Sequence, residues 1–96
     1  MTASAVPEPM SQLVSNLKRV IAERGLSLAE VANRAEINSG HLCLILRGRR
    51  MVQLDTLVKL AGALEVSPGD LLAGVTWVSD GRGGGEFRSH RPGASG

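Results

Sequence analysis

Two short helical segments separated by only three residues constrain the fold of this chain more than any other feature of its sequence. Ser27 and Asn38 are favoured N-cap residues, and Glu30 completes a capping box with Ser27. These caps predict helices over 28–35 and 39–47. The short joint between them forces the two helices to cross steeply, so the first turn of the second helix projects from the surface.

Three more helices are predicted around this pair. Apolar residues recur at helical spacing over about 11–24 and 54–64, and Ser67 with Pro68 marks the start of a last, brief helix. The residues expected to face the core are Leu13, Val14, Leu17, Val20, Ile21, Val31, Ala32, Ala35, Leu42, Ile45, Leu46, Leu54, Leu57, Leu60, Ala61, Leu64, Leu71 and Leu72. Five helices joined by short loops are expected to pack against one another as a single compact bundle. The expected fold class is therefore all-α, a compact five-helix bundle followed by a short β-prone extension.

The chain has 96 residues, which suits one domain. The bundle is expected over 10–74. Residues 1–9 are mostly small residues and prolines and are expected to form a flexible arm, whereas 75–88 form the β-prone extension. Residues 89–96 are expected to be a disordered tail, and the glycines gathered from residue 79 onward favour mobility there. With one Trp and one Phe, the chain must build its core from aliphatic side chains.

The residue inventory excludes several classes of function. The single cysteine, Cys43, cannot form an internal disulfide, and with only His41 and His90 beside it the usual four-ligand zinc sites are excluded. We find no phosphate-binding loop, no HExxH motif and no nucleophile–base set, so we expect no enzyme, no cofactor and no metal. We also expect a cytoplasmic protein, because no membrane-spanning run or signal-peptide pattern is present.

The steeply crossed pair of helices has the geometry of a helix-turn-helix, in which the second helix enters the major groove of DNA. A stronger match is carried by Ser27-Leu28-Ala29-Glu30-Val31-Ala32, Ile37-Asn38, Ile45-Leu46-Arg47-Gly48, Leu54-Asp55-Thr56-Leu57 and Val66-Ser67-Pro68-Gly69-Asp70-Leu71-Leu72. In this order and spacing, residues 11–74 resemble the phage-repressor-like (Xre/Cro type) DNA-binding family. The resemblance implies a regulator of transcription that binds double-stranded DNA, usually as a homodimer on a palindromic operator.

The resemblance also assigns candidate contacts with DNA. The base-reading positions are Ser39, Gly40 and His41 in the first turn of the second helix, and Leu44 one turn further on the same face. The positions assigned to the DNA backbone are Leu28, Arg47, Arg49 and Arg50. Arginine suits phosphate because its guanidinium can donate two parallel hydrogen bonds. The net charge of +2 adds little, because it is only mildly basic.

This sequence departs from the family pattern at positions that matter for both folding and DNA recognition. Glu36 stands where the family often has glycine, so it must adopt a left-handed conformation at a cost of about 1 kcal/mol or the turn must differ. Leu28 cannot make the phosphate hydrogen bond of the glutamine often found there. Gly40, Cys43 and Leu44 leave few polar groups for base recognition, although Leu44 could contact a thymine methyl.

Several of these residues have a simpler structural interpretation. The arginine cluster at 47–50 could be a solvated loop that complements a helix C-terminus, and His41 could be an exposed residue without a ligand. The side chain of Cys43 is better interpreted as a small, half-buried packing group than as a redox sensor. Function has an alternative too: the chain could be a protein-interaction module or an antitoxin, with the same bundle binding a protein partner.

A homodimer is expected, because one reading helix covers only a few base pairs. The β-prone run Val75-Thr76-Trp77-Val78 could pair with 86–88 of its own chain or with its own copy in a second subunit. The candidate dimer-interface residues are Leu71, Leu72, Trp77 and Phe87. Trp77 could instead cap the core of its own subunit.

Overall fold

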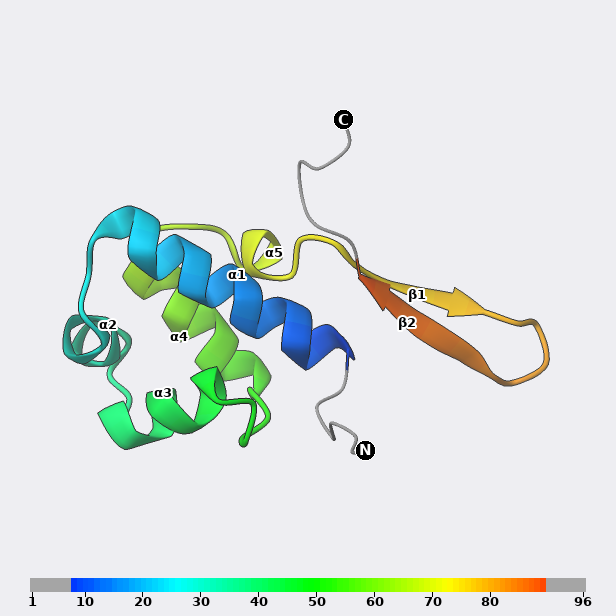
Figure 1. The fold of residues 1–96 in the computed structure, drawn as a ribbon, viewed down its shortest axis with the longest axis horizontal. Helices are drawn as coiled ribbons and strands as arrows, with labels where there is room; N and C mark the ends of the chain where they lie inside the picture. Colours follow the sequence, from blue (N-terminus) through cyan, green and yellow to red (C-terminus); the bar gives the residue numbers. More distant parts are fainter. Residues whose placement is uncertain (1–7, 90–96) are drawn as a thin grey trace.

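The computed structural model describes residues 8–89, which form five helices and one β-hairpin. The elements in chain order are α1 (Glu8–Arg24), α2 (Leu28–Ala35), α3 (Ser39–Leu46), α4 (Leu54–Leu64), α5 (Pro68–Leu71), β1 (Val75–Ser79) and β2 (Gly85–Ser89). The helices pack into one bundle, and the hairpin projects from the end where α1 begins (Figure 1). The expected all-α bundle with a β-type extension is confirmed.

The predicted helix boundaries are correct at most ends. The capping boxes at Ser27 and Ser67 both form, and the positive φ angles of Gly25 and Gly48 end α1 and α3 as expected. Two of the stated boundaries are wrong: α3 ends at Leu46 instead of 47, and α1 begins at Glu8, so the expected arm over 1–9 loses its last two residues to the helix. The rest of that arm, residues 1–7, lies outside the described residues.

Aliphatic side chains from all five helices fill the core. Leu17 of α1, Leu42 of α3 and Leu60 of α4 are completely buried in this core. Two predicted core positions are wrong. Leu54 is 76% exposed because it lies at the edge of the inward face of α4, and Leu72 is 38% exposed because α5 has already ended at that point.

One buried polar side chain ties α1 to the end of α5. Asn16 is 2% exposed, and its Nδ2 donates hydrogen bonds to the carbonyl oxygens of Leu71 at 2.8 Å and Ala73 at 3.1 Å. Its Oδ1 accepts a hydrogen bond from Gln12 at 3.2 Å. Because carbonyls at the end of a helix have no partner within that helix, Asn16 supplies the partner that α5 lacks. It therefore fixes where the chain leaves the bundle.

The extension forms an antiparallel hairpin within its own chain. Of the two pairings considered, this is the one between 75–78 and 86–88 of the same chain. Trp77 is opposite Phe87, and the two rings meet edge to face with their centroids 4.9 Å apart. Gly85 lies under the Trp77 ring, where any Cβ would collide with the carbonyl oxygen of Val78. Residues 85–89 form β2, so the expected tail over 89–96 loses its first residue to the strand. The remainder of the expected tail, 90–96, lies outside the described residues.

Candidate nucleic-acid interface

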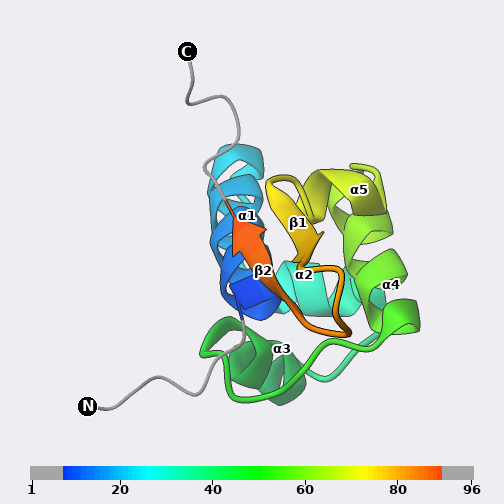
Figure 2. The same ribbon diagram turned by 90° about the vertical axis from the view of Figure 1, so that its right-hand side faces the viewer.

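The joint between α2 and α3 sets the orientation of the candidate reading helix. Glu36 adopts the left-handed conformation (φ 58°, ψ 43°), which was the first of the two possibilities for this position. The backbone N–H of Ile37 then donates to the carbonyl of Ala32 at 3.0 Å, and the Ile37 side chain packs against the core. The chain thus turns sharply within three residues. As a result α2 and α3 cross steeply at one side of the bundle (Figures 1 and 2).

Asn38 holds the beginning of α3. Its Oδ1 accepts hydrogen bonds from the backbone N–H groups of Gly40 at 2.7 Å and His41 at 3.3 Å. A Cβ at position 40 would lie 2.9 Å from this same oxygen. Gly40 therefore allows the cap to approach closely, a role that the sequence pattern alone did not indicate.

The first turn of α3 is available to a partner. Ser39 and Gly40 are exposed, and His41 and Leu44 are partly exposed. The opposite face, formed by Leu42, Ile45 and Leu46, is buried in the core. The four predicted base-reading residues therefore share the outer side of one helix, with His41 at its edge. Cys43 is half-buried.

Three exposed arginines follow the other end of α3. Arg47 is the C-cap of the helix, and the loop after it is held by a 2.8 Å hydrogen bond from the N–H of Arg49 to the carbonyl of Leu44. Within residues 8–89, no carboxylate forms an ion pair with Arg47, Arg49 or Arg50. Their charges are therefore available to an anionic partner. Leu28, at the first position of α2, is 39% exposed.

The predicted dimer-interface residues do not share one environment. Leu71 is completely buried in the core of its own chain, so it offers no surface to a partner. Leu72, Trp77 and Phe87 are exposed by 38%, 54% and 49% respectively. The hairpin therefore keeps both aromatic rings of the chain outside the bundle.

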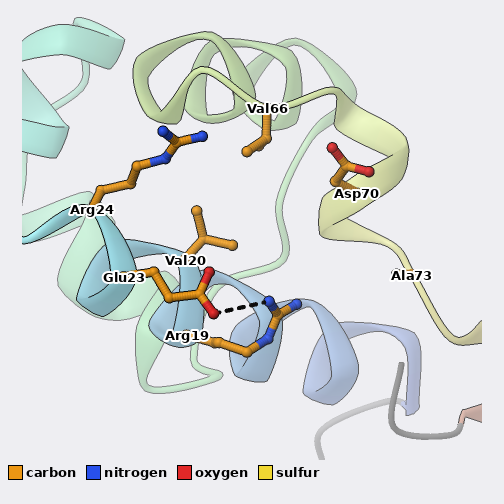
Figure 3. Close-up of a pocket in the computed structure, with 7 residues that line it drawn as sticks. All are labelled: Arg19, Val20, Glu23, Arg24, Val66, Asp70 and Ala73. Atoms are coloured by element: carbon orange, nitrogen blue, oxygen red, sulfur yellow. Dashed lines mark ion pairs between the residues drawn. The ribbon is translucent and has the colours of Figure 1, made fainter. Parts of the chain in front are cut away.

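An open groove of about 520 Å³ lies between α1 and the segment from Val66 to Ala73 (Figure 3). Its charged groups already have partners. Arg19 pairs with Glu23 at 3.6 Å, and Arg24 donates to the carbonyl of Glu65 at 3.3 Å. The carboxylate of Asp70 accepts the N–H of Ser67. This groove therefore has the character of a solvated helix junction rather than of a reaction site.

The described part of the chain provides no set of three His, Cys, Asp or Glu side chains placed to hold a metal ion. Nor does any of its helices have the length and apolar character needed to cross a membrane.

Comparison with known proteins identifies this arrangement. Residues 16–76 match the family model of the Cro/C1-type HTH DNA-binding domain. The chain is 36% identical over 69 residues to the HTH-type transcriptional regulator DdrOP3 of Deinococcus deserti, a match that covers 72% of this chain and 54% of that protein. It is 31% identical over 61 residues to YozG of Bacillus subtilis, an uncharacterised HTH-type transcriptional regulator, with coverage of 62% and 73%. The chain thus spans about half the length of the first relative and about three quarters of the second.

Solved structures show the same fold. The clp gene regulator ClgR of Corynebacterium glutamicum superposes with a TM-score of 0.64 at 30% identity, over 69% of this chain and 86% of that one. The restriction-modification controller protein C.AhdI of Aeromonas hydrophila gives a TM-score of 0.62 at 27% identity, over 65% and 94%. These matches and the family model confirm the resemblance first drawn from the capping and loop motifs. The chain belongs to the Cro/C1-type helix-turn-helix family of DNA-binding transcriptional regulators.

Proposed function

We propose that this protein is a sequence-specific repressor that acts in the cytoplasm as a homodimer on a palindromic operator in double-stranded DNA. The observation that supports this proposal best is the form of α3. Its first turn is exposed for base contact, and three arginines without ion pairs among the described residues follow its last turn. A reading helix needs both features, because base contacts give specificity while phosphate contacts fix its position.

In this proposal the beginning of α3 enters the major groove. Ser39 can donate to or accept from a base edge, and His41 can donate from its ring. Leu44 offers an apolar surface to a thymine methyl group. Gly40 contributes no side chain, so it allows the helix backbone to approach the bases closely. With so few polar groups, we expect each half-site to have a short sequence preference.

The backbone contacts would come from the two ends of the helix pair. Arg47, Arg49 and Arg50 would bind phosphates at the C-terminal end of α3. Leu28 at the first position of α2 would pack against the sugar-phosphate backbone without a side-chain hydrogen bond. Since each phosphate neutralised releases counterions, these contacts would make binding strongly dependent on salt.

The backbone assignment is tested by the slope of log binding constant against log salt concentration. Replacing the three arginines together by alanine should weaken binding to all duplexes and should flatten the slope by about one unit per lost contact. Lys18→Ala is a suitable control, because it removes an exposed cation from α1, which is given no contact. An unchanged slope in the triple variant would refute the assignment.

The base-reading assignment is tested by selecting genomic fragments that bind the purified protein. Separate replacement of Ser39, His41 and Leu44 by alanine should alter the selected motif, with each lost contact worth about 1–3 kcal/mol of discrimination. If all three variants return the motif of the unaltered protein, α3 is not the reading helix.

A protein-binding role, such as that of an antitoxin, is favoured by a different observation. Cys43 and Leu44 place apolar groups on the outer side of α3, where a purely DNA-reading helix often has polar groups. Capture of one protein in a salt-insensitive manner, without binding to random duplex DNA, would support this function over the first.

A further inference from the structure

The hairpin has one charged face and one aromatic face. The pairing register places Trp77 and Phe87 on the same side, while Glu86 and Arg88 form a 2.6 Å ion pair on the other. About half of each aromatic side chain remains exposed. A two-stranded hairpin is marginally stable in water unless its apolar face packs on something, so this face requires a cover.

The bundle from which the hairpin emerges leaves that aromatic face largely uncovered. The hairpin departs beside the first half of α1 and extends away from the helices (Figures 1 and 2). Its base is fixed by the hydrogen bonds of Asn16 to Leu71 and Ala73. The direction of the hairpin is therefore set by the bundle. Its exposed aromatic side chains are available for contact with another molecule.

The same end of the bundle carries an apolar groove. A pocket of about 140 Å³ lies between the start of α1, the loop before α4 and the end of α5. The residues that line it are Pro9, Met10, Leu13, Met51, Val52, Leu57 and Leu72. Leu54 and Val58 lie one turn apart on α4 and are 76% and 50% exposed. Of the eight large hydrophobic residues exposed in the described chain, all except Leu28 belong to this groove, to α4 beside it or to the hairpin.

We infer that the hairpins are exchanged between two copies of the chain: the aromatic face of each hairpin lies over the groove at Met51 and over the exposed Leu54 and Val58 of the other copy. One chain carries both the projecting aromatic surface and an apolar groove at the same end. A two-fold axis through that end brings each hairpin opposite the groove of the other subunit, and the contact closes with two copies. The inference rests on the proposed function, which requires two reading helices on a palindromic site.

The chain provides its own reporter for this contact. Trp77 is the only tryptophan, and it is 54% exposed in the single subunit. As the protein concentration rises through the dimerisation range, its emission should shift to shorter wavelength and its quenching by acrylamide should fall. Leu54→Glu should abolish both changes. It should also weaken dimerisation at least tenfold, so that the variant sediments as a monomer. Ala22→Glu, at an exposed position of α1 away from the groove, should leave all three measurements unchanged.

Cross-linking tests the exchange directly and does not depend on how Leu54→Glu folds. In a Cys43→Ser background, a chain carrying Ser79→Cys is mixed with a chain carrying Met51→Cys and oxidised mildly. The expected product is a disulfide between the two different chains, because position 79 follows Trp77 on the same hairpin face. A control mixture with Ala22→Cys in place of Met51→Cys should give no such product.

Two results would overturn the inference. One is a chain that sediments as a monomer at tens of micromolar with Trp77 still open to quencher. The other is a dimer that survives Leu54→Glu and yields no more disulfide with Met51→Cys than with the control. A monomer would also count against the homodimer of the proposed function, whereas DNA binding by α3 is measured separately by its salt slope. Failure of the exchange is therefore distinguishable from failure of DNA binding.

Discussion

The side chain of Asn16 offers the sharpest test of how the bundle holds its C-terminal extension. In Asn16→Ala the carbonyl oxygens of Leu71 and Ala73 lose the donor that lies 2.8 Å and 3.1 Å away. Each hydrogen bond contributes about 1 kcal/mol net, and a buried carbonyl left without a partner costs about another 1–2 kcal/mol. We therefore expect the free energy of unfolding to fall by about 3 kcal/mol.

That loss is large for a domain of this size. Stabilities of about 0.05–0.15 kcal/mol per residue are typical, so the variant would lose a substantial fraction of the total. Urea unfolding followed by circular dichroism measures the change. Gln12→Ala is the matched control: it removes only a part-buried hydrogen bond to Asn16, and we expect a change of less than about 0.5 kcal/mol. A loss below about 1 kcal/mol in Asn16→Ala would refute the reasoning.

Three other substitutions test local geometry. Glu36→Gly should raise the free energy of unfolding by up to about 1 kcal/mol in urea titrations, because glycine adopts the left-handed conformation of this turn without strain. Gly85→Ala should unfold the hairpin and leave the helices intact, because its methyl group would meet the carbonyl oxygen of Val78; red-shifted tryptophan emission with unchanged helical circular dichroism would show this. The backbone N–H and hydroxyl of Ser27 hold the pKa of Glu30 below its ordinary value. The carboxylate of Glu30 therefore stabilises the fold at pH values above its unfolded pKa, and this contribution is lost as the pH falls through its lower folded pKa. NMR titration of Ser27→Ala should show a higher pKa for Glu30.

Much of this fold was predictable because its helix ends are encoded locally. Ser27, Asn38 and Ser67 each cap a helix through atoms only two or three residues away, so their roles can be inferred from spacing alone. The position of the candidate reading helix followed from the short joint for the same reason. The aliphatic stripe of α1 was equally clear, because its period is a property of one helix.

The features that sequence reasoning missed depend on contacts between distant segments. Asn16 has no helical or capping signal, and its hydrogen bonds to Leu71 and Ala73 exist only after the bundle has formed. Leu54 fits the apolar period of α4 but lies at the edge of its buried face. The burial of Leu71 and the exposure of Leu72 are decided by where α5 stops.

The close approach of Asn38 to Gly40 has a consequence for attempts to alter what this protein recognises. Position 40 lies on the outer side of α3, so it is an obvious place to introduce a new side chain. Any such side chain would begin with a Cβ 2.9 Å from the oxygen that caps the helix. The Asn38 side chain would then have to shift, which would weaken its hydrogen bonds to the backbone N–H groups at the start of α3. A library that varies position 40 should therefore vary position 38 as well, so that a side chain at the first can be matched by a cap that leaves room for it at the second.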